Sequence, residues 1–314
     1  MADVYNVEVI EFDTLISDEC DLYRDDVFKE LIRRINTGEF FAAIIGTPCG
    51  TFSVARIPKP GLPADGPPQV RSISHIHGLP GLSDYYRRQV EVSDVLVARS
   101  IAIARAVHAR GGHFIIENPV TRSDPITEHY RWRWRSHASL WMHPLVKELK
   151  LERWTRSVSF PQCALGGEFQ KWTTLLFSVG FETPLRELGS LRCDHALHPK
   201  QASGLADGKW RSAEAAAYPA GMNAIVTHAC AHVLSRPGMQ VGSKRPHAIN
   251  KPISDAAAPS PHTLPKSVSA GGIRRLEPET EDVLRVEAMP EANVPPVTAE
   301  ADTPTDDRPT PAPR

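Results

Sequence analysis

Two groups that could do nucleophilic and acid–base chemistry follow two apolar runs in this 314-residue chain. Cys49 comes shortly after Phe40–Ile45, and Glu117 comes directly after His113–Ile116. A continuous apolar run is typical of a strand that is buried on both faces of a parallel sheet. A cysteine thiolate can attack carbon, and a carboxyl group can protonate or hydrogen-bond the same substrate. Because ligands bind outside the carboxyl ends of the strands in open α/β sheets, we expect both groups at one site.

Taken singly, neither residue identifies a site. A lone cysteine is usually inert, and a glutamate before Asn-Pro usually caps a turn, so the argument rests on both groups reaching the same sheet edge. A thiol-dependent hydrolase is an alternative function, in which Cys49 would be paired with a histidine such as His113. That class requires a base beside the nucleophile.

The elements that must position these groups alternate between strands and helices. Apolar residues at helical spacing predict helices over Asp25–Asn36 and Val90–Arg110, followed by a helical region from about residue 120 to about 150. The predicted strands are Val7–Asp13, Phe40–Ile45, His113–Ile116, Ser157–Phe160 and Thr174–Val179. Residues 57–83 are too long for a routine connection, which predicts a functional or mobile loop. The alternation predicts an α/β fold with a doubly wound, mostly parallel sheet.

Composition divides the chain into two parts. Residues 237–314 hold 14 of the 28 prolines and no Phe, Trp, Tyr or Cys, which predicts a disordered tail beside one domain over 1–236. A net charge of −1 argues against a wholesale basic nucleic-acid binder but leaves room for a local basic groove. The sequence holds no apolar run of about 20 residues, and its five cysteines are scattered. We expect an intracellular protein without a membrane anchor.

Two segments around the candidate groups resemble the cytosine-5 DNA methyltransferases, in the divergent form carried by mobile elements and viruses of protists. Gly46–Ala55, which reads Gly-Thr-Pro-Cys-Gly-Thr-Phe-Ser-Val-Ala, is similar to the family's catalytic Pro-Cys motif. Phe114–Pro119 is similar to its Glu-Asn-Val motif, with Pro in place of Val. Gln170–Gly180 and Gly208–Pro219 are similar to two later motifs. The resemblance spans about residues 7–235.

The resemblance implies a sheet of the S-adenosylmethionine-dependent methyltransferase type and a role for each matched residue. Cys49 would add to C6 of a cytosine that is flipped out or already single-stranded, and Glu117 would contact the ring N3. The cofactor would be S-adenosylmethionine, held by Asp13 at the ribose, Asp21 at the adenine, and Pro48. The nucleic acid, DNA or RNA, would contact Ser53, Arg56, Asn118, Gln170 and Lys171.

Three departures from the family pattern bear on activity. The family's first motif, Phe-x-Gly-x-Gly, should precede Val7, but the six residues before it contain no glycine. The Gln170 segment lacks both expected arginines, and the region over 181–208 is short for target recognition. We therefore expect an N-terminally truncated domain that binds the cofactor poorly and is catalytically silent. The alternative is a nucleic-acid-binding module of a mobile element.

Other motifs carry weaker signals. The run from Arg131 to Arg135 interleaves cations with tryptophans, which favours nucleic-acid contact through Arg131 and Arg133. Ser243–His247 resembles a short nuclear signal. Cys193, His195 and His198 have ligand-like spacing that Cys163 could join, but paired Cys-x2-Cys knuckles are absent, so we assign no metal and expect a polar loop. His228 and His232 lack the acid of a His-Glu-x-x-His site.

Overall fold

The computed structural model describes residues 8–58, 66–123, 134–200, 205–206 and 209–235. Its helices are α2 (Asp25–Asn36), α3 (Asp84–Ala109), α4 (Pro144–Leu151), α5 (Glu182–Leu185), α6 (Arg211–Glu214) and α7 (Ala220–Leu234). Its strands are β1 (Ala42–Gly46), β2 (His113–Pro119), β3 (Thr155–Pro161), β4 (Trp172–Ser178), β5 (Leu205–Ala206) and β6 (Lys209–Trp210). Seven short 3-10 turns, η1 to η7, connect these elements in the described part of the chain. The proposed tail, 237–314, and the proposed nuclear signal lie outside the described residues.

The main sheet has four strands in the order β1-β2-β4-β3. β1 and β2 are parallel, whereas β4 runs antiparallel to both β2 and β3. The α/β class is confirmed, but the prediction of a mostly parallel sheet is wrong because the sheet is mixed. β3 and β4 are joined by the ten residues between Pro161 and Trp172. That connection is too short for a parallel crossover, which needs a dozen residues or more.

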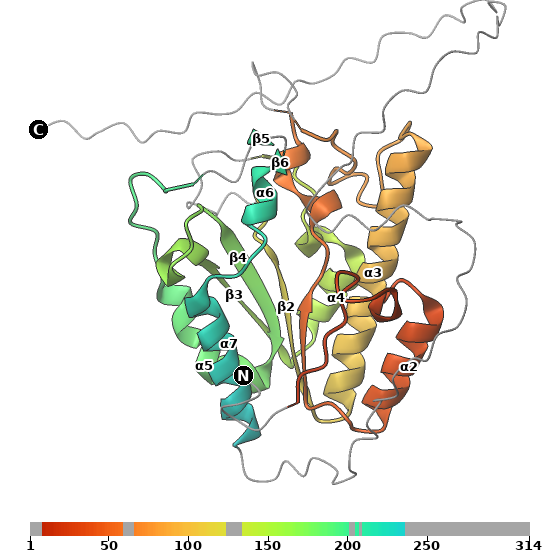
Figure 1. Cartoon of the computed structure of the whole chain (residues 1–314), viewed down its shortest axis with the longest axis vertical. Coiled ribbons are helices and arrows are strands. Elements are labelled where there is room, and N and C mark those ends of the chain that lie inside the picture. Colours follow the sequence, from red (N-terminus) through yellow and green to blue (C-terminus); the bar gives the residue numbers. More distant parts are fainter. Residues whose placement is uncertain (1–7, 59–65, 124–133, 201–204, 207–208, 236–314) are drawn as a thin grey trace, which may run out of the picture.

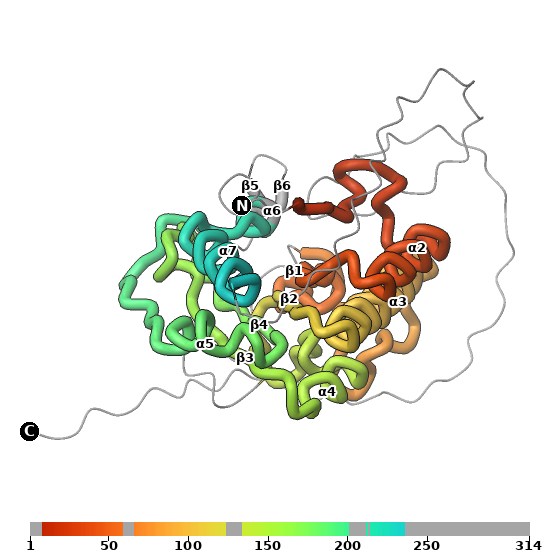
Figure 2. The backbone as a smooth tube through the Cα atoms, turned by 90° about the horizontal axis from the view of Figure 1, so that it is seen from below, coloured from red at the N-terminus to blue at the C-terminus, as the bar shows by residue number. Residues whose placement is uncertain are grey.

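Helices cover both faces of this sheet (Figures 1 and 2). On one face, α3 and α4 bury a cluster that includes Phe114, Ile116 and Leu176. On the other face, α5 and α7 pack over Ile115, Leu175 and neighbouring side chains. The two sets alternate along β2 because successive strand residues point to opposite faces. Glu117, two residues after Ile115, therefore points to the α7 face.

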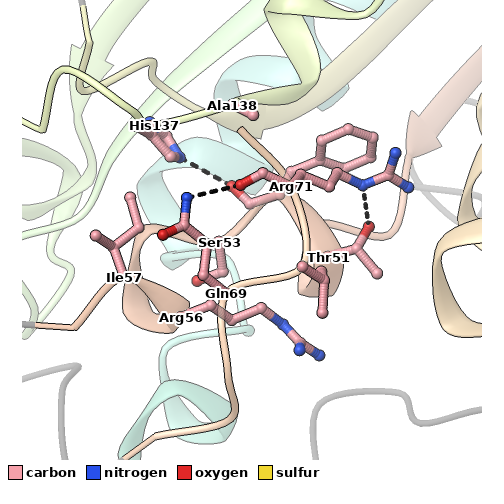
Figure 3. A pocket seen from close by; sticks show the side chains of 10 residues that line it. Thr51, Ser53, Arg56, Ile57, Gln69, Arg71, His137 and Ala138 are labelled. Atoms are coloured by element: carbon pink, nitrogen blue, oxygen red, sulfur yellow. Dashed lines mark hydrogen bonds between the residues drawn. The ribbon is translucent and has the colours of Figure 1, made fainter. Parts of the chain in front are cut away.

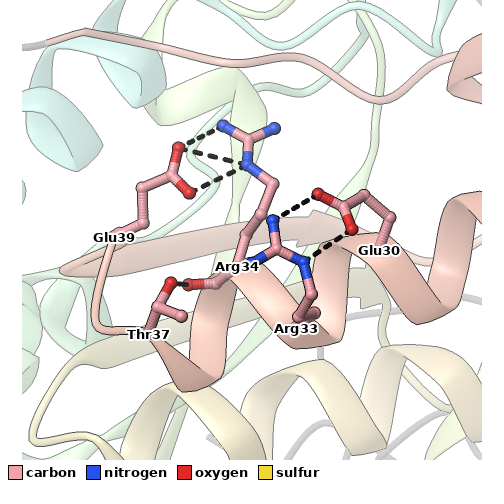
Figure 4. A network of polar contacts seen from close by, with 5 residues as sticks. All are labelled: Glu30, Arg33, Arg34, Thr37 and Glu39. Carbon is pink, nitrogen blue, oxygen red and sulfur yellow. Dashed lines mark hydrogen bonds and ion pairs between the residues drawn. The ribbon is translucent and has the colours of Figure 1, made fainter. Parts of the chain in front are cut away.

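α2 forms where the apolar spacing predicted it. Asp25 and Asp26 occupy its first turn, and Arg33 and Arg34 occupy its last, so both ends complement the helix dipole. At its carboxyl end Arg33 pairs with Glu30, and Arg34 pairs with Glu39 beyond the helix (Figure 4). α2 packs on α3 through Leu31, Ile35 and their neighbours, in a cluster that also includes Ala43 and Ile45 of β1.

Three local predictions differ from the structure. Of the predicted strand Val7–Asp13, the described residues 8–13 form no strand, and Val9 and Ile10 are exposed. β1 is an edge strand in the described part of the sheet, and Ile44 is 47% exposed, so it is not buried on both faces. Between residues 134 and 150 only η4 (Leu140–Met142) and α4 are helical. The other predicted helices and strands are confirmed to within a few residues at most boundaries.

Among the described helices, none has the length and apolar character needed to cross a lipid bilayer.

Candidate active site at the carboxyl ends of β1 and β2

The structure brings the two predicted catalytic residues to the same sheet edge. Gly46, the last residue of β1, is the register partner of Glu117 in β2. Cys49 lies three residues beyond Gly46, at the start of the turn η2 (Gly50–Phe52). Because β1 and β2 are parallel, their carboxyl ends deliver the thiol and the carboxyl group together.

Two hydroxyl groups hold the Glu117 side chain, which is only 7% exposed. Thr173 Oγ1, from β4, donates to Glu117 Oε1, and Tyr218 Oη donates to Glu117 Oε2 at 2.7 Å. Burial and the negative charge of Glu117 raise the pKa of the Tyr218 hydroxyl well above its usual value. Tyr218 therefore stays a donor, and the carboxyl group is fixed in orientation at the strand end.

Cys49 is exposed, yet many protein atoms surround its thiol, and Glu117 is near enough to influence the pKa of that thiol. The loss of hydration and the Glu117 carboxylate raise the pKa of the Cys49 thiol, whereas Lys171 lowers it. Lys171 is held by a hydrogen bond from Nζ to the Ala215 carbonyl at 3.0 Å and lies 5.5 Å from the centre of the Tyr218 ring. The thiol is therefore not activated in the resting protein, and neutralisation of Glu117 would favour its thiolate.

Gly46 lets Tyr218 reach the strand end. A Cβ atom at Gly46 would stand 3.3 Å from Tyr218 Oη, a distance tighter than ordinary contact. A Cβ at this position would require Tyr218 Oη to move by a few tenths of an ångström, so glycine leaves room for the close approach.

Asn118 holds the turn that carries Cys49 by a hydrogen bond to its backbone. Its Nδ2 donates to the Thr47 carbonyl at 2.7 Å, and its side chain is buried. Thr47 in turn bonds Ser100 of α3, with 3.2 Å between the hydroxyl oxygens. The side chain predicted to contact nucleic acid is therefore engaged in holding the backbone that carries Cys49.

Arg56 has a similar structural use. Its guanidinium nitrogens donate to the Gly50 and Pro68 carbonyls at 2.7 and 3.1 Å and to Gln89 at 2.9 Å. These bonds close the segment after Cys49 against the loop at residue 68. Each of the three nitrogens makes one bond within the chain, which leaves one N–H on each terminal nitrogen for another partner.

Two buried side chains complete this support (Figure 3). Arg71 Nε donates to Thr51 Oγ1 at 3.1 Å, and His137 Nε2 lies 2.9 Å from the Phe52 carbonyl. The cavity that they line has only about 10 Å³, room for about one water molecule, so it holds no base. The described part of the predicted long loop thus contributes Arg71 to the core.

The predicted cofactor residues lie in the segment before α2. Asp13 is exposed and follows no strand, and its Oδ1 accepts the Leu15 amide at 2.8 Å. Asp21 Oδ1 accepts the Tyr23 amide at 2.8 Å. Both carboxylates therefore cap turns of their own chain. Pro48, the third predicted cofactor contact, is exposed beside Cys49.

The remaining predicted contacts are dispersed. Ser53 Oγ accepts the Ala55 amide at 3.2 Å and caps the turn η3 (Val54–Arg56). Gln170 is exposed immediately before β4. Arg131 and Arg133 lie outside the described residues.

His113 does not supply the base that the hydrolase alternative requires beside Cys49. His113 begins β2 opposite Ala42, at the start of β1, whereas Cys49 follows the end of β1. Four residues of strand put about 13 Å between His113 and Glu117 along β2, at about 3.3 Å per residue. His113 lies beside Ser178 instead, with 3.2 Å between Nδ1 and Oγ.

Two site residues, Thr173 and Tyr218, were not singled out from the sequence. Tyr218 stands in the Tyr-Pro ending of the last matched motif, which was a usable signal, while Thr173 carries none. The arrangement can bring a nucleophile and an oriented carboxyl group to one substrate. In comparisons with protein-family models, curated proteins and solved structures, the chain matches none of them.

Proposed function

We propose that this chain is a cytosine-5 methyltransferase-like domain whose Cys49 adds to a cytosine base of nucleic acid. The observation that supports this most strongly is the register of Gly46 with Glu117, which brings the thiol to a carboxyl group that two hydroxyls orient. Sheets with helices on both faces bind ligands at this edge. The methyltransferase type of sheet and the cytosine substrate are parts of the proposal that rest on the sequence resemblance.

In the proposed reaction, Glu117 in its protonated form donates a hydrogen bond to N3 of the cytosine while the Cys49 thiolate attacks C6. The Sγ–C6 bond forms as the electron pair of the C5–C6 double bond moves into the ring, and C5 takes a proton from water. Loss of the original C5 proton and departure of the thiolate restore the aromatic base. A Glu117 carboxyl group that holds the proton shared with N3 carries no negative charge and repels the thiolate less, so a base bound through that proton favours the attack.

The methyl donor that the resemblance implies, S-adenosylmethionine, does not fit the described residues. Asp13 does not end a strand of the sheet, and both Asp13 and Asp21 use a carboxylate oxygen to cap their own turns. We therefore derive no methyl-transfer step. These observations also favour a second candidate function, a nucleic-acid-binding module that holds cytosine without turning it over.

Exchange of the cytosine C5 hydrogen with deuterium oxide tests the proposal without a cofactor. A single-stranded cytosine-containing oligonucleotide is incubated with the full chain, and deuterium at C5 is measured by mass spectrometry. We expect exchange by the wild-type protein, none by Cys49→Ser, and a decrease of about 10²-fold or more in Glu117→Gln. Cys20→Ser is the matched control, because Cys20 lies in the segment before α2.

Exchange that persists in Cys49→Ser would show that another group is the nucleophile. Binding of the oligonucleotide without exchange would favour the binding module over the enzyme.

A further inference from the structure

A second cluster of reactive side chains lies away from the Cys49 edge. It consists of Cys163, Cys193, His195 and His198, and one Cys sulfur or His nitrogen from each lies within 4.8 Å of all the others. Cys193 Sγ is 3.2 Å from His198 Nε2 and 3.9 Å from His195 Nδ1. The rings of His195 and His198 are 5.1 Å apart between centres.

Two separate segments supply these four side chains. Cys163 is buried in the turn η5 (Gln162–Leu165), between β3 and β4. The other three come from the loop that follows η7 (Arg186–Ser190). The two segments are also joined where the Lys200 amide donates to the Glu168 carbonyl at 3.1 Å. The cluster thus adds side-chain contacts between two segments that a backbone hydrogen bond already joins.

The separations fit a tetrahedral metal ion. Zinc bonds of about 2.0–2.3 Å to nitrogen and sulfur place tetrahedral ligand atoms about 3.3–3.8 Å apart. The two measured distances, 3.2 and 3.9 Å, span that interval. Two thiolates and two imidazoles are also the ligand set of many structural zinc sites, in which four protein ligands leave no open position.

We propose that Cys163, Cys193, His195 and His198 bind one zinc ion that ties the 191–200 loop to η5. The sequence alone favoured a polar loop because no paired Cys-x2-Cys knuckle is present. The fold supplies the missing ligand by bringing η5 against the loop. A closed set of four protein ligands assigns the ion a structural role.

The other cluster with metal-binding groups in the described part of the chain does not compete for this assignment. His77, Asp94 and His143 lie together, but Arg71 Nη1 already binds Asp94 Oδ1 at 2.7 Å. A guanidinium at that distance would repel a divalent cation, so this group is an ion pair between the buried Arg71 and the partly buried Asp94, with two histidines beside it.

The proposed ion would also stiffen the approach to Tyr218. A Cβ at Gly221 would stand 2.7 Å from the Leu165 carbonyl oxygen, and one at Gly167 would stand 3.3 Å from the Pro219 ring. η5 and the residues after it therefore pack directly against the start of α7. Zinc held at Cys163 would fix the surface on which the Tyr218–Pro219 turn rests.

Metal content of the full chain tests the site directly. The protein is purified under reducing conditions with zinc in the growth medium, passed through gel filtration, and analysed by mass spectrometry of the elements. We expect one zinc per chain. Cys163→Ser, Cys193→Ser and His198→Asn should each lower the zinc affinity by more than about 100-fold, a larger loss than substitutions of residues that only hydrogen-bond to metal ligands cause. Cys20→Ser and His228→Asn are matched controls that should retain the ion.

Loading the wild-type chain with cobalt in place of zinc tests the site without relying on a variant that fails to fold. The wild-type chain loaded with Co²⁺ should show the visible absorption of a tetrahedral site and a thiolate-to-cobalt charge-transfer band. That band should weaken in each cysteine variant and persist in His228→Asn. A reduced chain that binds no zinc and gives no thiolate band would overturn the proposal. A Cys163–Cys193 disulfide that persists in protein freshly purified under reducing conditions would also overturn the proposal.

Discussion

The hydroxyl of Tyr218 donates to the carboxylate of Glu117 at 2.7 Å, although 101 residues separate them in the chain. This bond joins the end of β2 to the residue just before α7 and crosses the sheet edge where Cys49 lies. Gly46, the neighbour of Glu117 in β1, has no side chain to crowd the hydroxyl. The candidate site is therefore closed by tertiary contacts and not by any one motif.

Removing this hydroxyl should weaken the fold. Tyr218→Phe keeps the ring but leaves one carboxylate oxygen of the buried Glu117 without its donor. A hydrogen bond to a charged group contributes about 1.5–3 kcal/mol, so we expect a loss of that size in urea unfolding at neutral pH. Unchanged stability would mean that water replaces the hydroxyl at no cost.

The charge of Glu117 should control the reactivity of Cys49. Because the negative carboxylate raises the pKa of the thiol, Glu117→Gln should lower that pKa, and Lys171→Met should raise it. The pH dependence of alkylation by iodoacetamide measures both, with Cys49→Ser identifying the signal among five cysteines. A thiol pKa that does not respond to Glu117→Gln would show that crowding alone sets it.

Local signals in the sequence were sufficient to predict the helix and strands that position this site. Apolar residues at helical spacing predicted α2 with the bounds that the structure has, and apolar runs predicted β1 and β2. Once those strands were parallel, their carboxyl ends had to deliver Cys49 and Glu117 together. These features could be predicted because each depends on neighbours in the chain or on a general rule of sheet geometry.

Features that depend on distant partners could not be predicted. The alternation of Val7–Asp13 is typical of a strand, yet nothing in the segment itself shows whether a neighbouring strand is available. Thr173 and Tyr218 have ordinary surroundings in the sequence, and only the fold brings them to Glu117. Arg71 stands in a loop rich in proline and glycine, where a buried arginine has no local signal.

Arg71 should be among the most sensitive positions in the protein. Its side chain is almost fully buried, binds Asp94 at 2.7 Å, and lies with its guanidinium carbon 4.2 Å from the centre of the Phe52 ring. Removing one partner of a fully buried ion pair costs about 3–5 kcal/mol, and Asp94 is 21% exposed, so Arg71→Met should lose less stability than that but more than a surface ion pair would cost. Arg71→Met with Asp94→Asn should recover part of the loss, because no charge remains unpaired. Equal losses in the single and double variants would contradict a charge effect.

Acid should destabilise the protein through His137. Its Nδ1 accepts the Arg122 amide at 2.9 Å and its Nε2 donates to Phe52, so both nitrogens are used by the neutral ring. Burial lowers its pKa from 6.5 to about 4, so below pH 6.5 the unfolded chain binds a proton that the folded chain does not. Linkage then gives a loss of about 2 kcal/mol between pH 7.5 and pH 5 from this group. Urea unfolding should show that loss in the wild-type protein and a smaller one in His137→Gln. The same pH dependence in both would assign it to other groups, among them His143, whose pKa burial also lowers to about 4.

S-adenosylmethionine should stabilise this chain very little. Asp13 and Asp21 would be its ribose and adenine contacts, but each carboxylate already caps a turn, and the described residues 8–13 form no strand of the sheet. A ligand present at its dissociation constant stabilises by about 0.4 kcal/mol, and a domain of about 230 residues gains about 2–4 °C per kcal/mol. We therefore expect about 1 mM S-adenosylmethionine to raise the melting temperature by less than about 1 °C, and Asp13→Asn to leave that response unchanged. A shift of several degrees that Asp13→Asn abolishes would show that the segment docks on the sheet when the cofactor binds, and would restore methyl transfer as the reaction of this site.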